Sequence, residues 1–173
     1  MKLNIIDDDG FIAIVNNANY QGFVDENWQS DQLMNHFIDQ MNIGNIVVWQ
    51  TSNDGGGNWI VSFQEEPSNN CAFREFEQLI NVTERELFLT NYSDLTMAAQ
   101  FSDAFIPATH NADLRIELEN GWHKLTVRQL FDPNYTLDYL DNQTGEDVSF
   151  EIIITSVDAA IPQKVNNIYW RES

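Results

Sequence analysis

Three consecutive carboxylates, Asp7, Asp8 and Asp9, precede Gly10 and are the first residues along the chain that could bind a cation. Calcium loops of the EF-hand type need oxygen ligands at alternating positions, a glycine at the sixth position and a bidentate acid at the twelfth. Isoleucines stand at positions 5 and 6, where further oxygen ligands would be needed. The spacing therefore favours an acidic turn over a metal site, and we expect no bound metal.

Basic side chains gather in the segment DLRIELENGWHKLTVRQLF, residues 113–131, which carries three of the eight Lys and Arg in the chain. Its Asn120-Gly121 pair is the strongest short signal for a two-residue hairpin turn. With Glu119 opposite Trp122, the cross-strand pairs predicted on one face are Glu117–Lys124, Arg115–Thr126 and Asp113–Arg128. We therefore interpret these bases as structural ion-pair partners and not as catalytic groups.

Two aromatic residues of this predicted hairpin have different expected roles. His123 falls on the apolar face with Leu125 and Val127, so we expect a packed or edge histidine and not a proton shuttle. Trp122 falls on the polar face, where an exposed aromatic ring can anchor a protein partner. Trp122 is therefore a candidate partner-binding residue.

The remaining nucleophiles and metal ligands lack catalytic spacing. The histidines stand at positions 36, 110 and 123 and form no zinc-binding pattern. Glu65 and Glu66 oppose ionisation of Cys71, the one thiol, and SNDGGGN lacks the Gly-Lys-Ser/Thr ending of a phosphate loop. A pair of glycosidase carboxylates stays open, because 27 acids make chance pairing easy. We expect no catalytic residue and no cofactor.

One stretch has a helical period. WQSDQLMNHFIDQMNIG repeats apolar residues at positions 33, 34, 37, 38 and 41, which is the spacing of one helix face. Ser30 can cap its N-terminus, Asp31 complements the helix dipole, and Gly44 can end it. The sequence predicts one amphipathic helix near residues 30–43.

Most other apolar segments are typical of strands. They lie at residues 3–5, 11–15, 45–51, 58–64, 73–82, 86–92, 94–101, in the hairpin at 113–131, and at 147–157. The glycine-bearing turns at 7–10 and 52–57 are predicted to join neighbouring strands as antiparallel hairpins. Residues 83–85 and 93–94 are predicted turns.

About nine or ten strands and one helix indicate a mainly β fold of the α+β class. We expect an antiparallel β-sandwich, or a strongly curved sheet, with the helix packed on it or across an end. The 173 residues suit a single domain, with a core of about residues 1–158 and no element assigned to 159–173. Because MKLNIIDDDG lacks a basic region followed by an apolar stretch, we expect a cytoplasmic protein.

Charge is the strongest compositional signal. The chain holds 27 acids and 8 bases, a formal net charge of −19. No Lys or Arg occurs between Lys2 and Arg74, or from Gln129 to Gln163, and both stretches are rich in acids. Such a surface repels nucleic acid and anionic membranes and attracts a basic protein. The candidate partner-binding residues are Asp7, Asp8, Asp9, Asp25, Glu26, Glu65, Glu66, Asp138, Asp141, Glu146 and Asp147, with Trp122 and Tyr135 as aromatic anchors.

Four segments in order, WQSDQLMNHFIDQMNIGNIVVW, INVTERELFLTN, DLRIELENGWHKLTVRQLF and VSFEIIITSV, resemble the bacterial nuclease-inhibitor family of competence and toxin loci, the competence protein J-like proteins. The resemblance spans roughly residues 25–157 and involves no catalytic motif. It implies a small acidic β-sandwich that binds a nuclease or another toxin and keeps it inactive. The N-terminal hairpin and the acidic segment 132–147 depart from the family pattern.

The charge pattern and the resemblance favour an immunity protein without catalysis of its own, which covers the cleft of a basic toxin, in the first place a nuclease. Two other classes stay open. An acidic chaperone or adaptor would hold a basic secreted effector without inactivating it. A carboxylate-using enzyme or carbohydrate-binding module would bind a small ligand.

Overall fold

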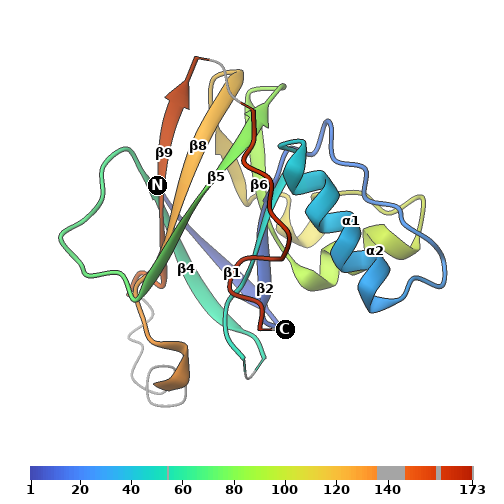
Figure 1. Ribbon diagram of the computed structural model, residues 1–173, viewed down its shortest axis with the longest axis horizontal. Helices are drawn as coiled ribbons and strands as arrows, with labels where there is room; N and C mark the ends of the chain where they lie inside the picture. The colour runs from blue at the N-terminus through green and yellow to red at the C-terminus, as the bar shows by residue number, and fades with distance from the viewer. Residues whose placement is uncertain (54, 136–146, 159–160, 173) are drawn as a thin grey trace.

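The computed structural model describes residues 1–53, 55–135, 147–158 and 161–172 (Figure 1). The described strands are β1 (Lys2–Asp7), β2 (Phe11–Val15), β3 (Ile46–Gln50), β4 (Gly57–Gln64), β5 (Arg74–Val82), β6 (Glu86–Asn91), β7 (Arg115–Glu117), β8 (Gly121–Gln129) and β9 (Phe150–Val157). The helices are α1 (Ser30–Asn42) and α2 (Tyr92–Gln100), with 3-10 turns at Thr109–Asn111 and Pro133–Tyr135.

The strands form two sheets. The first sheet has the order β1-β4-β9-β8-β5 and the second has the order β3-β2-β6-β7. All strand pairs are antiparallel except β4 and β9, which are parallel. Both helices lie on the side of the second sheet that faces away from the first (Figure 1). The predicted mainly β, α+β fold is confirmed, with three layers.

The middle layer is apolar on both faces. On β2, Ile12 and Ile14 face the core between the sheets, while Ala13 and Val15 pack with Phe37 in the core under the helices. A strand buried on both faces needs a continuous apolar run, which explains FIAIV. In the first sheet, β5 and β8 instead alternate between buried and more exposed residues, because the outer face of that sheet meets solvent.

The predicted hairpins are wrong in one consistent way. The turn at 7–10 leads from β1 in the first sheet to β2 in the second, and 52–57 leads from β3 back to β4 in the first. The Asn120-Gly121 turn likewise joins β7 of the second sheet to β8 of the first. Each turn therefore connects two layers, and its arms face each other across the core without pairing as neighbouring strands.

Lys124 and Arg128 are ion-paired as predicted, but with other partners, and Arg115, which was predicted to lie opposite Thr126, is ion-paired as well. Arg115 contacts Glu86 at 2.7 Å and Glu117 at 3.2 Å. Lys124 contacts Glu77 on β5 at 2.8 Å. Arg128 pairs with Glu151 on β9 and, at 3.4 Å, with Glu75. Apart from Arg115–Glu117, which lies within β7, these contacts link strands that are neighbours in the observed sheets. The interpretation of the bases as structural is therefore supported.

Helix α1 agrees with the sequence pattern. It buries Leu33, Met34, Phe37 and Met41, and Gly44 follows it with a φ of +80°. Gln29 occupies the N-cap in place of Ser30, and its backbone N–H donates to the Gln32 side chain at 2.7 Å.

Helix α2 corrects the strand predicted at 94–101 and the turn predicted at 93–94. The Asn91 side chain accepts a hydrogen bond from the Asp94 backbone at 3.0 Å and caps the helix. Leu95, Ala98 and Ala99 then form its buried face. The described chain thus has two α-helices where one was expected.

The C-terminal segment, for which the sequence predicted no element, packs along the sandwich. Tyr169 forms a parallel bridge with Trp49 of β3 and stacks on Phe76 with ring centroids 3.7 Å apart. Its hydroxyl donates to the backbone carbonyl of Glu77 at 3.1 Å. Neither described helix is both long and apolar enough to cross a membrane.

Candidate partner-binding cleft

A cleft of about 830 Å³ opens at one end of the sandwich. In the first sheet it is lined by the end of β4, the end of β9 and the start of β8, and β7 of the second sheet faces them. Those strand ends adjoin because β4 and β9 run parallel and β8 runs against them. Strand β7 has only three residues, so it leaves part of the opposite sheet uncovered.

The floor of this cleft is apolar and its rim is acidic. Phe63, Ile116, Leu118 and Ile154 supply apolar surface. Acidic side chains stand around them, namely Glu65, Glu66, Glu117 and Glu119. All four acidic residues are exposed. An apolar centre within a charged rim is the usual composition of a protein-binding surface.

The positive groups of the cleft lining are already engaged. Arg115 contacts Glu86 and Glu117, and the amino group of Met1 donates to the Phe63 carbonyl at 3.0 Å. Glu65 and Glu66 have no ion pair among the described residues. Their field is therefore available to a partner.

His123 adds a buried hydrogen-bonding group to the cleft wall. It is 5% exposed, and its Nε2 lies 2.8 Å from the carbonyl oxygen of Glu119. Because a carbonyl only accepts, Nε2 donates this hydrogen bond. Nδ1 is buried without a hydrogen-bond partner in the described structure. The prediction of a packed histidine is confirmed.

Asp7 requires a correction to the predicted acidic surface. Its side chain is 2% exposed. Oδ1 accepts from the backbones of Asp9, Gly10 and Phe11 at 3.0–3.2 Å, and Oδ2 accepts from two side chains, described below. Burial raises its pKa, and the hydrogen bonds oppose that rise. Asp7 holds the crossover between the sheets and does not reach a partner.

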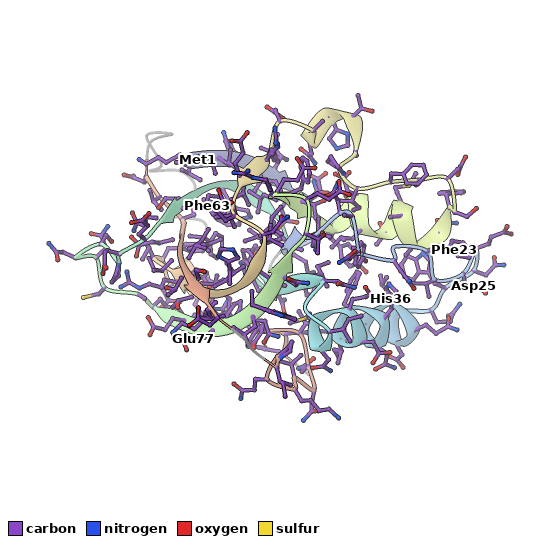
Figure 2. The ribbon with its side chains drawn as sticks, turned by 90° about the horizontal axis from the view of Figure 1, so that it is seen from above. Met1, Phe23, Asp25, His36, Phe63 and Glu77 are labelled. Atoms are coloured by element: carbon purple, nitrogen blue, oxygen red, sulfur yellow. The ribbon has the colours of Figure 1, made fainter. Side chains whose placement is uncertain are left out.

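The other predicted acids do not form one patch. Asp8 and Asp9 are exposed at the β1–β2 crossover, and Asp147 is exposed before β9. Asp25 and Glu26 are exposed near the helices, and Figure 2 shows Asp25 far from Met1 and Phe63 of the cleft. Asp138, Asp141, Glu146 and the side chain of Tyr135 lie outside the described residues.

Trp122 is not the exposed turn aromatic that the hairpin predicted. It is half-buried, and its ring packs so closely over Gly44 that a Cβ at Gly44 would lie 2.4 Å from it. The ring thus joins the end of α1 to β8.

Glu117 and Glu119 were missed as members of an acidic rim, because the predicted hairpin placed Glu117 opposite Lys124 and Glu119 opposite Trp122. The alternation in RIELE, residues 115–119, could have found them. In a strand it places Glu117 and Glu119 on the face opposite that of Ile116 and Leu118. Among the described residues, no group of three or more His, Cys, Asp and Glu is placed to hold a metal ion.

No protein-family model matches the sequence, and no curated protein matches it either. Among solved structures, a protein titled crocagin biosynthetic gene J has a TM-score of 0.58 at 9% identity, over 88% of this chain and 94% of that one. ComJ of Bacillus subtilis, titled an inhibitor of the DNA-degrading activity of NucA, has a TM-score of 0.49 at 8% identity, over 91% and 96%. The first similarity shows a shared fold. Identities this low establish no family, so the nuclease-inhibitor resemblance stays a prediction.

Proposed function

We propose that this protein is an immunity protein that binds a basic toxin, in the first place a nuclease, and holds it inactive. The observation that carries the proposal is the cleft, where an apolar floor lies inside a rim of four exposed acidic residues. The net charge of −19 extends the same sign of potential over the molecule.

Inhibition follows from the substrate of such a toxin. A nuclease binds phosphates with a basic surface, so a carboxylate-rich surface competes for the same groups. Opposite charges can raise association rate constants from about 10⁵–10⁶ to about 10⁸–10⁹ M⁻¹s⁻¹ at low salt. Rapid capture is useful when the toxin acts on the cell's own nucleic acid.

The apolar floor of the cleft supplies the anchors for slow dissociation, which charge alone does not provide. Slow dissociation needs desolvated apolar anchors near the centre of an interface, and Phe63, Leu118 and Ile154 offer them. We therefore expect the partner to insert an apolar side chain flanked by basic ones.

The test begins with capture of partners from the native cell at low salt. A retained basic protein is assayed for nuclease activity in the complex and after separation. Inactivity in the complex and activity after separation support the proposal. A partner that is equally active in both states contradicts inhibition and favours a chaperone or adaptor.

A charge-neutral variant locates the contact. Glu65→Gln with Glu66→Gln should slow association with the captured partner more than it speeds dissociation. The matched control, Asp8→Asn with Asp9→Asn, removes the same charge from exposed positions outside the cleft lining. Equal effects of the two variants, or kinetics that do not change with salt, would contradict a cleft-based electrostatic mechanism.

A further inference from the structure

A second surface lies where the segment before α1 meets the end of α2. The backbones of Val24 and Asp25 donate to the Ala99 carbonyl at 2.9 and 3.1 Å. From α1, Nε2 of His36 donates to the Gln21 carbonyl at 2.6 Å. These bonds fix the segment against both helices, so the side chains it presents are held in place.

Exposed aromatic rings gather on this surface. Phe23 is 47% exposed and Phe105 is 78% exposed, and both line a hollow of about 330 Å³. Phe101, also exposed, lines an adjoining hollow that shares Ser102 with the first. Large apolar side chains grouped in this way are typical of an interaction surface.

Two residues that line the first hollow each hold a polar atom without a hydrogen-bond partner in the described structure. The two atoms are the Asn17 Oδ1 and the Tyr20 hydroxyl oxygen, and both are buried. Burial raises the pKa of Tyr20, so the phenol is neutral at physiological pH. An occupant whose N–H donors reach these two atoms would satisfy both groups.

Carboxylates stand at the second hollow, which adjoins the first. Glu26 and Asp103 line the second hollow, and Asp25 is exposed beside Glu26. The residues that line the two hollows include no Lys or Arg. The local potential is therefore negative, which attracts a cation and repels a second copy of this acidic chain.

We propose that the two adjoining hollows together form an aromatic–acidic pocket, which binds an arginine side chain from a basic protein segment. A guanidinium stacks on aromatic rings, carries five N–H donors and stays charged at every physiological pH. Phe23 and Phe105 supply the rings, Asn17 and Tyr20 the acceptors, and Asp25, Glu26 and Asp103 the opposite charge. A lysine offers no planar group to stack.

The pocket is distinct from the cleft. Figure 2 shows Phe23 and Asp25 at one end of the molecule, with Met1 and Phe63 far from them on the other side of its centre. The two sites share no lining residue. A basic partner could be held at two points, or two basic segments could be joined, whether or not the partner is a nuclease.

The first test uses small probes and the intact protein. Acetyl-Gly-Arg-Gly-amide is titrated into labelled protein and followed by amide chemical shifts, with the lysine and citrulline analogues in parallel. Shifts should centre on residues 17–26 and 101–106, follow a binding curve with arginine, be weaker with lysine and be absent with citrulline. Citrulline equal to arginine, or shifts that centre on the cleft, would overturn the proposal.

Variants then separate the two sites. Phe105→Ala removes an exposed ring and should weaken arginine binding by about two- to fivefold, the effect of a cation–π contact at an exposed site. Glu65→Gln with Glu66→Gln should leave it unchanged, so failure of the inhibitor proposal does not affect this result. No loss in Phe105→Ala, or binding of phosphatidylcholine vesicles or of a second copy in place of arginine, overturns the assignment.

Discussion

Asp7 shows how a residue that resembles part of a metal site can serve as a structural acceptor. Its Oδ2 accepts from the Thr51 hydroxyl at 2.8 Å and from the Trp59 indole N–H at 3.3 Å. Together with the three backbone donors on Oδ1, these groups tie the crossover after β1 to the end of β3 and to β4. The Asp7 carboxylate thus connects three strands by hydrogen bonds at one end of the core.

Replacing Asp7 with Asn should destabilise the protein by about 1–3 kcal/mol, the cost of leaving buried donors unsatisfied. The new amide would direct N–H groups at Thr51 and Trp59, and Trp59 has only a donor to offer. The midpoint of urea unfolding measures the loss. Asp8→Asn, at an exposed position, should change the free energy of unfolding by no more than about 0.5 kcal/mol. Equal effects of the two variants would contradict the structural role of the Asp7 carboxylate.

Lys124 controls the ionisation of Glu77. Its hydrogen bond and charge lower the Glu77 pKa below the ordinary 4.5. A lowered folded-state pKa gives stability that is present above the unfolded pKa and is lost as pH falls through the folded one. Lys124→Met should therefore raise the Glu77 pKa toward 4.5, as measured by NMR titration of its carboxyl. Lys2→Met should not change it, and a similar rise there would indicate a general charge effect.

At the scale of elements, Gly44 fixes the distance between α1 and β8. A side chain there would need a φ of +80° and would place its Cβ 2.4 Å from the Trp122 ring. We expect Gly44→Ala to cost about 2–4 kcal/mol, from backbone strain and overpacking. In a double-mutant cycle with Trp122→Ala the steric part should disappear. Strict additivity would show that the ring does not contact this position.

The Arg128–Glu151 pair joins β8 to β9 under the loop after β4. The two side chains are 12% and 2% exposed, and Glu151 also accepts from the Ser68 backbone at 3.1 Å. Arg128→Met leaves a buried carboxylate unpaired and should cost about 3–5 kcal/mol. The double variant with Glu151→Leu should recover much of that loss in chemical unfolding. A double variant as unstable as the single one would contradict this account.

The periodicity predicted most elements, but not which strands are partners. Asn120-Gly121 reverses the chain direction, and that local chemistry is the same in a hairpin and in a link between layers. Ile116 and Leu125 face one core in either case, so alternation does not distinguish them. The decisive information is non-local, because β7 pairs with β6 and β8 pairs with β5 and β9. Helix α2 was predictable from the cap at Asn91.

The cleft was only half predictable for the same reason. Glu65 and Glu66 stand out as adjacent acids in a stretch without bases. Glu117 and Glu119 join them only because β7 lies opposite the ends of β4 and β9. A sequence shows how many acids there are, whereas the crossing pattern decides which of them share a rim. The burial of Asp7 was hidden for the same reason.

At the scale of the whole molecule, the imbalance of 27 acids and 8 bases is sharpened by structure. Arg85, Arg115, Lys124 and Arg128 are each within 4 Å of a carboxylate. Arg74 stacks over the Trp170 ring at 4.3 Å. Four of the eight basic side chains are thus neutralised locally by a carboxylate, while many acids among the described residues have no such partner. Repulsion among these acids opposes the compact state, and their negative potential attracts a basic protein.

Salt should consequently act in opposite directions on folding and on binding. Raising NaCl from about 0.01 M to about 0.5 M shortens the Debye length from roughly 30 Å to less than 10 Å, which weakens long-range repulsion. The exposed ion pairs lose little, since each contributes only about 0–1 kcal/mol. The melting temperature should therefore rise with salt, while association with a basic partner slows.

The combined variant Asp8→Asn, Asp9→Asn, Glu65→Gln and Glu66→Gln tests whether repulsion among carboxylates causes this salt dependence. It should have a higher melting temperature at low salt and a smaller rise with NaCl, because four repelling charges are gone. Calorimetry in parallel salt series measures both quantities. A melting temperature that falls with NaCl would mean that the ion pairs outweigh the repulsion, and the one-sided surface would then have to be explained by partner binding alone.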